Sequence, residues 1–545
     1  MEESIDDPVI LQISLIGFHH KKGWIQEFSY PEICAIDIDM EHLPTLCLPD
    51  QSHNFESDSV YFILPNKDSA NDSKKVFGVS CFRQIPIEKL TNRSENDEFS
   101  RSSVQKSVCC LSRLPLFGYI EVKLNIIVDK IFEHGMFDCS EFLRESYNEL
   151  NRCLTLRMLK SPENSNGNEF LNDFFIETCL RELILLWRHK ILLLFKLLLI
   201  EKRVLFFGSP VKPVCATILS IISLHPQLLS DGLCNDFGSK DLTFEQSECE
   251  EFDVKTTPVI DKTPDSDKSD DIDCVKQITI LPTIPPAEYL APLQIFRNGF
   301  LCLPFISLHY FDVLTDKSHN GFIVGASNVL FQQKKNLVDV MIDVTNQTID
   351  FIDLDIKKCL ALTTEDLRFY DHVIKGIENP RADGYGTDSW IREQFESYFT
   401  SMLRTAYDSE NRQDWECFNE HFMEVWVRSN NYQDWLAKKI TSTSSGSGVS
   451  AFDTFPRGHP FARRNNARNV SDFKNKIVQS INNTQSARKI NQAVNNTFSN
   501  AKTTFSSWLS NFSHQKDETA NKDMMNMESR DKIENIDLTF DTLHK

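Results

Sequence analysis

The chain has 545 residues, a formal net charge of −20 at pH 7 and 41% hydrophobic residues. A chain of this length is too long for one hydrophobic core and suggests about three domains with linkers. The excess of acidic residues argues against nucleic acid as a general partner.

The N-terminus and the cysteines indicate a reducing compartment. The first residues, MEESIDDPVI, lack the cationic region and apolar core of a secretory signal. The 15 cysteines form no CxxC pair, and only Cys109 and Cys110 are close in the sequence. An odd, unpatterned set of cysteines favours reduced thiols in the cytosol, and core packing for Cys109 and Cys110.

The first 155 residues are expected to form one α+β domain. Strands are predicted where apolar residues alternate, and helices where they recur every three or four positions. The predicted strands are Val9–Gly17, Trp24–Phe28, Val60–Leu64 and Val76–Phe82, and the predicted helices are Val104–Leu114 and Ile120–Phe132. A basic turn containing His19 and His20 joins the first two strands. Neighbouring side chains at a strand end face opposite ways, which favours a solvated turn over a metal site.

The segment Trp187–Pro210, WRHKILLLFKLLLIEKRVLFFGSP, is the most informative part of the chain. It predicts a helix at Ile191–Ile200, a charged hinge, a buried strand at Val204–Phe207 and a tight turn. A second helix is predicted at Cys215–Leu224. Helix, strand, turn and helix in this order are typical of an α/β core.

A membrane span at residues 183–200 is the alternative interpretation of this segment. Its least charged window, Ile191–Ile200, contains one charge, Lys196, and is flanked by charged residues on both sides. A helix of this length spans ~15 Å, or half of a hydrocarbon core. Each charge near the middle of a bilayer costs about 2.5–3.5 kcal/mol. We therefore expect a buried helix of the protein core.

A second domain is expected at residues 170–336, after a polar linker at 161–169. An acidic insert at 236–276 interrupts it, with 13 acidic residues, 5 lysines and a local charge of −8. The length and composition of the insert predict a disordered surface loop. Beyond it, strands are predicted at Gln277–Leu281, Gln294–Phe296, Gly299–Leu303 and Gly321–Val324.

After Leu337 the pattern becomes helical, and a third, all-helical domain is expected at residues 337–440. Thr364 is the predicted N-cap of a helix with Leu367, Tyr370 and Ile374 on one face. Two further apolar stripes each predict a helix, and they consist of Ile391, Phe395, Tyr398 and Met402, and of Trp415, Phe418, Phe422 and Val425. The Ser/Gly-rich segment Thr441–Ser450 is expected to be a flexible linker.

The C-terminal region, residues 441–545, contains a basic stretch. Residues 456–515 have nine Lys or Arg and one acidic residue. One helical face would carry Ile490, Val494, Phe498, Phe505, Trp508, Leu509 and Phe512. Opposite a face rich in Asn, Ser and Thr, these residues predict an amphipathic segment that lies reversibly on a membrane surface. The alternative is a helix that packs back on the folded domains.

In this order the parts resemble the tripartite DENN module. The upstream resemblance lies in GFHHKKGWIQEFSYP, LCLPDQSHN and VFGVSCFRQI, and the central resemblance in RHKILLLFKLLLIEKRVLFFGSP and RNGFLCLPFISL. The predicted helices after residue 337 resemble the downstream part. Within that superfamily the chain is most similar to the late secretory pathway proteins of the Avl type. The acidic insert is where the chain departs most from a compact version.

The resemblance implies an α/β (α+β) fold with a longin-like lobe at 1–155, an α/β lobe at 170–336 and a helical lobe at 337–440. Many DENN proteins are guanine nucleotide exchange factors for Rab GTPases. The Avl-type branch is associated with post-Golgi and recycling transport, with cell migration as a related process. A Rab-type GTPase is therefore the expected partner, on Golgi-derived or recycling endosomal membranes.

No enzyme motif accompanies this resemblance. The chain has no Walker-type phosphate loop, no G-x-S-x-G elbow and no H-E-x-x-H pair, so no catalytic, cofactor-binding or metal-binding residue is predicted. Nucleotide exchange needs only a surface that prefers the nucleotide-free GTPase. Lys21, Lys22 and Arg203 are candidates for that surface, with simple solvation as the alternative. Other functions left open are a non-catalytic Rab effector or tethering scaffold, and a membrane protein anchored at 183–200.

Overall fold

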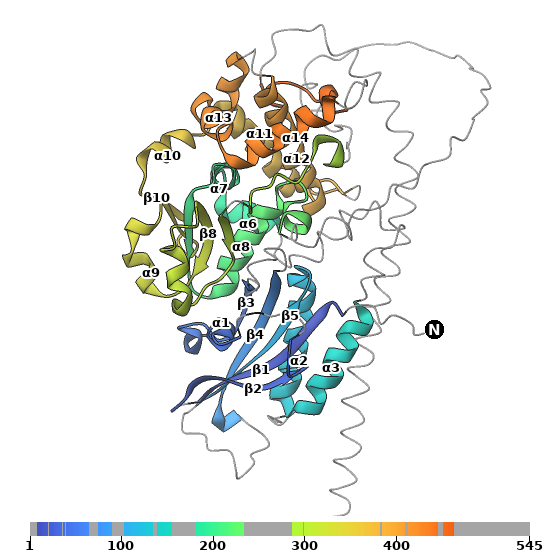
Figure 1. Ribbon diagram of the computed structural model, residues 1–545, viewed down its shortest axis with the longest axis vertical. Coiled ribbons are helices and arrows are strands. Elements are labelled where there is room, and N and C mark those ends of the chain that lie inside the picture. The colour runs from blue at the N-terminus through green and yellow to red at the C-terminus, as the bar shows by residue number, and fades with distance from the viewer. Residues whose placement is uncertain are drawn as a thin grey trace, which may run out of the picture.

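Three units follow one another along the long axis of the computed structural model (Figure 1). The first unit is an antiparallel sheet with its helices, the second unit is a mostly parallel sheet, and the third, the helical unit, is a group of helices. The structure describes residues 8–64, 75–89, 103–134, 139–154, 180–233, 286–381, 384–408, 412–444 and 451–462, apart from residues 20, 35, 37, 39 and 298. The mixed α/β class predicted from the sequence is confirmed.

The first unit is built on five strands. In sheet order they are β2 (Gly23–Tyr30), β1 (Ile10–His19), β5 (Ser103–Ser112), β4 (Val76–Pro86) and β3 (Ser57–Leu64), and each neighbouring pair is antiparallel. Helix α2 (Phe117–His134) packs on β4 and β5, and α3 (Ser140–Cys153) packs on β1 and β2. A short helix, α1 (Leu43–Cys47), contacts the same sheet. Both cysteines of the pair at 109–110 are buried in β5.

One helix predicted in the first unit is wrong. The sequence predicts a helix at residues 104–114 because Val104, Val108 and Leu111 have helical spacing, but residues 104–112 belong to β5. This strand lies in the middle of the sheet, between β1 and β4, and residues Ser107–Ser112 are all buried. A strand buried on both faces lacks polar–apolar alternation, so periodicity does not distinguish it from a buried helix. The helix predicted at Ile120–Phe132 is confirmed as part of α2.

The second unit is a sheet centred on the predicted strand at 204–207. Its order is β10 (Thr348–Phe351), β9 (Val340–Asp343), β6 (Arg203–Phe207), β8 (Gly321–Ala326) and β7 (Phe300–Leu303). All neighbours are parallel except β10, which is antiparallel to β9. Helices α6 (Leu180–Trp187), α7 (Lys190–Leu199) and α8 (Val211–Ser223) belong to this unit.

Two expectations for the second unit are wrong. Gln294–Phe296 is not a strand; Ile295 and Phe296 are buried in an irregular segment after a short 3-10 helix, η5 (Pro286–Tyr289). The chain after Leu337 first forms β9 and β10, so the second sheet continues beyond residue 336. These strands have only four residues each, too few for alternation to be recognised. The predicted strand Gln277–Leu281 and the acidic insert lie outside the described residues.

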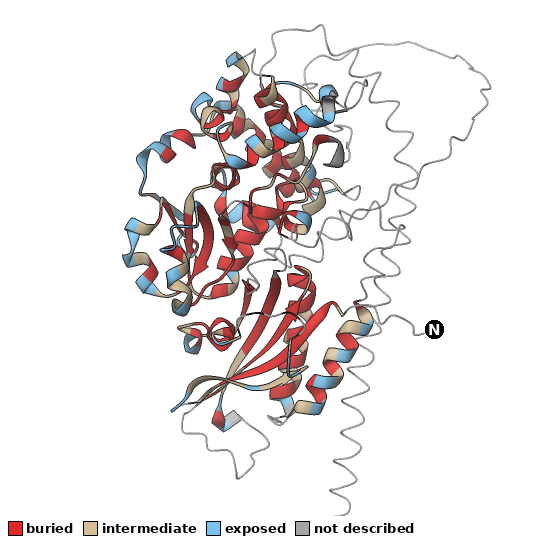
Figure 2. Ribbon diagram, in the orientation of Figure 1, coloured by how far each residue is buried: buried red, intermediate tan, exposed pale blue. Residues whose placement is uncertain are grey.

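The leucine-rich segment is the buried helix that the sequence predicts. Eight of the ten residues of α7 are buried, including Lys196, whose amino group is 2.6 Å from a carboxylate oxygen of Asp366 in the helical unit. Of the helices within the described ranges, none has the length and apolar character needed to cross a bilayer. Figure 2 shows buried residues along both sheets and the helices beside them, with exposed residues on α9 (Val329–Gln333) and α10 (Leu354–Cys359).

The helical unit contains α10, α11 (Thr364–Glu378), α12 (Asp388–Tyr407), α13 (Glu420–Trp426) and α14 (Asn430–Ser444). Thr363, one residue before the predicted cap, is the N-cap of α11 and forms a capping box with Asp366. All four residues of the stripe that begins at Ile391 are buried on α12. The stripe that begins at Trp415 is not one helix. Asn419, with φ of 73°, separates a 3-10 segment, η8 (Arg412–Phe418), from α13.

Candidate functional site at the joint between the two sheets

A carboxylate of the first unit occupies the N-terminus of a helix in the second unit. Asp58, at the start of β3, accepts hydrogen bonds from the backbone amides of Val211 (2.6 Å) and Lys212 (3.0 Å), in the first turn of α8. The N-terminus of a helix that follows a parallel strand favours anions, such as phosphate groups in nucleotide-binding folds. Here the anion comes from the protein itself. Burial raises the pKa of Asp58, and the amide hydrogen bonds oppose that rise.

A second group of polar contacts involves Lys212 in the first turn of α8 and Cys215 one turn further along the helix. The hydroxyl of Tyr61 on β3 donates a 2.5 Å hydrogen bond to Glu121 on α2. The other carboxylate oxygen of Glu121 is 2.8 Å from the amino group of Lys212. The thiol of Cys215 donates to the carbonyl oxygen of Tyr61 at 3.4 Å. Glu121 is fully buried, and a buried carboxylate is costly unless it is paired and hydrogen-bonded. Tyr61 and Lys212 supply these interactions.

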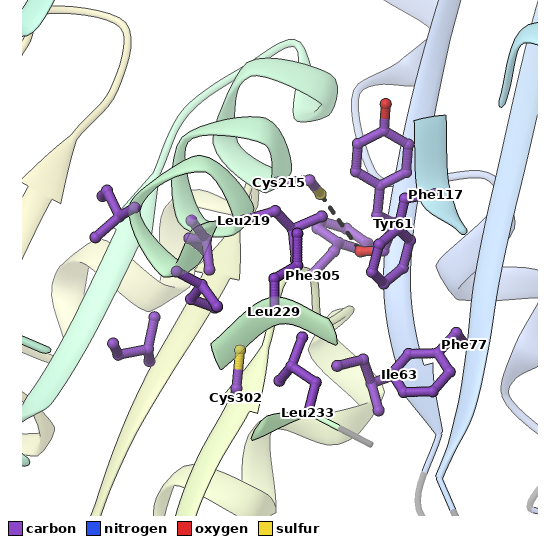
Figure 3. Close-up of a cluster of buried hydrophobic side chains, with 14 of the residues drawn as sticks. Tyr61, Ile63, Phe77, Phe117, Cys215, Leu219, Leu229, Leu233, Cys302 and Phe305 are labelled. Atoms are coloured by element: carbon purple, nitrogen blue, oxygen red, sulfur yellow. Dashed lines mark hydrogen bonds between the residues drawn. The ribbon is translucent and has the colours of Figure 1, made fainter. Parts of the chain in front are cut away.

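The interior of the joint is apolar (Figure 3). It combines side chains of the first sheet and α2 with side chains of α8, of the turn after α8 and of the segment around β7. Its labelled residues are Tyr61, Ile63, Phe77, Phe117, Cys215, Leu219, Leu229, Leu233, Cys302 and Phe305, and all of them are buried. Exposing three large side chains of this kind to water costs about 5–9 kcal/mol. These buried contacts therefore oppose separation of the two units.

Aromatic and imidazole side chains continue the joint to the surface. The ring of His42, just before α1, stacks on that of His309 with 5.0 Å between centroids. His42 also contacts Tyr310 at 5.9 Å, and Trp24 on β2 contacts His309 at 6.1 Å. His309 is exposed and the other three are half-buried. We call Trp24, His42, His309 and Tyr310 the seam residues, since two belong to the first unit and two to η6 (Leu308–Leu314) of the second.

Two further hydrogen bonds hold the units together beside the seam. The hydroxyls of Thr45 on α1 and Ser307 are 2.8 Å apart. The side-chain amide of Asn328 donates to Asp50 at 2.7 Å. Asn328 also caps α9 by accepting from the amide of Leu330, so its orientation is fixed from both sides.

The structure places the predicted GTPase-facing residues in two different units of the molecule. Lys21 and Lys22 are exposed in the turn between β1 and β2, next to Trp24, and their amides donate to Nδ1 of His19. Arg203 is at the N-terminal end of β6, whereas the C-terminal end of that strand leads into α8 at the joint. Its guanidinium is 2.6 Å from Asp339, and this hydrogen bond raises the pKa of Arg203. The candidate tail residues, from Ile490 to Phe512, lie outside the described residues.

Sequence reasoning missed Asp58 and the seam residues. Asp58 has no distinguishing local pattern, and His42 and His309 become neighbours only through the fold. Within the described ranges, no three His, Cys, Asp or Glu side chains are grouped so that they could hold a metal ion.

Comparison with known proteins assigns the chain to a family. The family model described as transport protein Avl9 matches residues 10–406, well over half of the chain. The late secretory pathway protein AVL9 of Saccharomyces cerevisiae is 26% identical, with 97% of this chain and 68% of the relative covered. The late secretory pathway protein avl9 of Schizosaccharomyces pombe is 29% identical, with 80% and 88% covered. The chain is a member of the Avl9 family of transport proteins.

Proposed function

We propose that the protein regulates vesicle traffic in the late secretory and recycling pathway by acting on a Rab-type GTPase as a guanine nucleotide exchange factor. The names of the two yeast relatives support the pathway. The resemblance to the tripartite DENN module supports the GTPase, and the order of the three units agrees with that module. The protein would act at the surface of a Golgi-derived or recycling endosomal membrane.

The observation that carries the exchange proposal is the tightly packed joint with the seam residues at its surface, where His309 is exposed and Trp24, His42 and Tyr310 are half-buried. An exchange factor lowers nucleotide affinity by the factor with which it prefers the nucleotide-free GTPase. A 1,000-fold preference requires about 4 kcal/mol of differential contact. A preorganised surface loses little of that free energy to ordering. Aromatic side chains such as Trp24 and Tyr310 are suited to act as the central anchors of such an interface.

The test is release of a fluorescent GDP analogue from each member of a Rab panel, with catalytic amounts of the full chain. We expect accelerated release from at least one Rab, together with retention of the nucleotide-free form of that Rab in a pull-down. The alternative function, a non-catalytic effector or tether, predicts retention of the GTP-loaded form and unchanged release rates. Unchanged rates across the whole panel would defeat the exchange proposal.

A separate proposal concerns the C-terminal region, on the basis of its sequence. Its apolar face and nearby basic residues would bind the chain reversibly to anionic membranes. The test is flotation of the full chain with small phosphatidylserine-containing vesicles. Replacing Phe498→Asp together with Trp508→Asp should abolish flotation, because both changes place charge on the apolar face. Unchanged flotation would instead favour a helix that packs on the folded units.

A further inference from the structure

Residues 451–462 follow α14 in the chain and pack against the helical unit at two contact points, one at Phe452 and one at His459. We call these residues the strap. At the first point Phe452 is fully buried among the rings of Tyr407 and Trp435, with centroids at 5.7 and 5.4 Å. The amino group of Lys439 lies 4.7 Å from the centroid of the Phe452 ring. Phe455 extends this contact to Tyr289 of η5 at 5.6 Å.

The second point is an imidazole inserted beside a buried ion pair. His459 is 1% exposed, and its Nε2 atom is 3.3 Å from Oδ1 of Asp366. Its Nδ1 atom accepts a hydrogen bond from the amide of Phe461, so the ring hydrogen lies on Nε2 and is donated to Asp366. Phe461 packs against Phe369 at 5.8 Å between ring centroids.

The backbone between the two points is shaped to fit α12. Gly458 has φ of 76°, a conformation that favours glycine, and its amide donates to the hydroxyl of Thr405 at 2.9 Å. Arg457 forms an ion pair with Asp408 at the end of the same helix. The strap thus has one docked conformation, held by contacts with α11, α12 and α14.

The ion pair under the strap is complete without it. Oδ2 of Asp366 is 2.6 Å from the amino group of Lys196 and also accepts from the amide of Thr363 at 3.0 Å. Oδ1 accepts from the hydroxyl of Tyr398 at 2.7 Å. Burial lowers the pKa of His459, so the ring is neutral, and its departure would leave no uncompensated charge. Water could take its place on Asp366.

We propose that the strap is a detachable segment that controls how far the basic C-terminal region reaches from the folded body. While it is docked, the end of the strap lies beside α11, because Arg368 donates a hydrogen bond to the carbonyl oxygen of Phe461 at 3.4 Å. When it is released, the C-terminal region is tethered at the end of α14, at residue 444. The 18 residues 445–462 then add a reach of at most ~60 Å when extended. The family match ends at residue 406, before the strap begins.

The test is hydrogen–deuterium exchange on the full chain. In the wild type, the amides of Gly458, Phe461 and Ala462 should exchange at least about 100-fold more slowly than in an unstructured peptide. In the double variant Phe452→Ala/His459→Ala this protection should fall to less than about tenfold, while protection in α11 and α12 changes by less than about threefold. Cleavage by trypsin after Arg457 should accelerate in parallel.

The matched control is Phe452→Leu/His459→Asn, which keeps an apolar side chain at the first point and a donor at the second. Its strap should stay protected to within about tenfold of the wild type. Two results would overturn the proposal. An unprotected strap in the wild type would mean that it does not dock, and loss of protection in α11 and α12 together with the strap would mean that it does not detach separately.

Discussion

The carboxylate of Asp58 and the backbone amide of Val211 are 2.6 Å apart, and their hydrogen bond joins β3 of the first sheet to the first turn of α8 in the second unit. The position at which an α/β fold can hold an anionic ligand is therefore used to fix two units to each other. Buried apolar side chains of both units, such as Phe117 and Leu219, add to the contact at the joint (Figure 3). The seam residues therefore lie on a joint that is held by both a hydrogen bond and buried apolar contacts.

Replacing Asp58→Ala should lower the free energy of unfolding by about 1–3 kcal/mol, because two amides at the start of α8 lose their acceptor in a buried setting. Asp58→Asn keeps an oxygen acceptor and should cost less. The matched control is Asp353→Ala, which removes the exposed cap of α10 and should cost roughly 0.5–1 kcal/mol. Urea unfolding measures all three, and a cost for Asp58→Ala no larger than that of the control would contradict the role of the joint.

Replacing Lys196→Met should destabilise the chain by about 3–5 kcal/mol, since Asp366 loses its cationic partner in the interior. The double variant Lys196→Met/Asp366→Asn removes both charges and should recover a large part of that loss. Urea unfolding of the single and double variants gives the coupling energy. If the single variant stays within about 1 kcal/mol of the wild type, α7 is not held to the helical unit by this pair.

Stability should decline in acid through His225, which is buried at the end of α8 with its ring stacked 4.0 Å from that of Phe195. Burial lowers the pKa of His225 from 6.5 to about 3. Between these values the unfolded chain binds a proton that the folded chain excludes, so stability rises with pH and is lost as pH falls below 6.5.

The measurement is the free energy of unfolding at several values between pH 6.5 and pH 4, for the wild type and for His225→Phe. The slope of the free energy of unfolding against pH should be smaller in the variant by about 1.4 kcal/mol per pH unit, which is the contribution of one proton. The slope is compared rather than the absolute stability, because the variant also loses the hydrogen bond between His225 and the carbonyl oxygen of Phe195. Equal slopes would show that His225 is not excluded from protonation.

Charge reversal in the β1–β2 turn should slow association with the GTPase. Lys21→Glu/Lys22→Glu should reduce the association rate constant by about tenfold at low salt, with a smaller effect at high salt, because exposed charges steer encounter and are screened by ions. The control is Arg203→Glu, which reverses a charge at the N-terminal end of β6, the end of the strand that lies away from the joint. The measurement is the association rate constant from stopped-flow binding at two salt concentrations. An equal effect of both variants would mean that the GTPase does not bind next to the β1–β2 turn.

The parts that could be predicted from the sequence are those specified by local pattern. The helix before Glu201, the strand Val204–Phe207 and the following turn appear where the periodicity places them. The pattern fails where tertiary packing decides. The middle strand β5 looks helical because both of its faces are buried, and Asn419 breaks an apolar stripe by adopting a positive φ.

The candidate site was the least predictable part. The basic turn that contains Lys21 and Lys22 could be located from the sequence because a turn between two strands is a local feature, and the role of these residues toward a GTPase stays a prediction. His42 and His309 acquire their relationship only when α1 and η6 meet across the joint. Asp58 acquires its role only when α8 is placed against β3. No local sequence pattern in α1, η6, β3 or α8 specifies that these elements contact each other.

The most direct test of the account is the rate of GDP release from the responsive Rab in the presence of Trp24→Ala/His309→Ala. The matched control is His189→Ala/Tyr370→Ala, which removes a similar imidazole–aromatic pair, with centroids 6.3 Å apart, away from the seam. We expect the seam variant to lose at least about tenfold of the acceleration, equivalent to about 1.4 kcal/mol, while the control keeps it. Full acceleration by the seam variant, or an equal loss in both, would contradict the account.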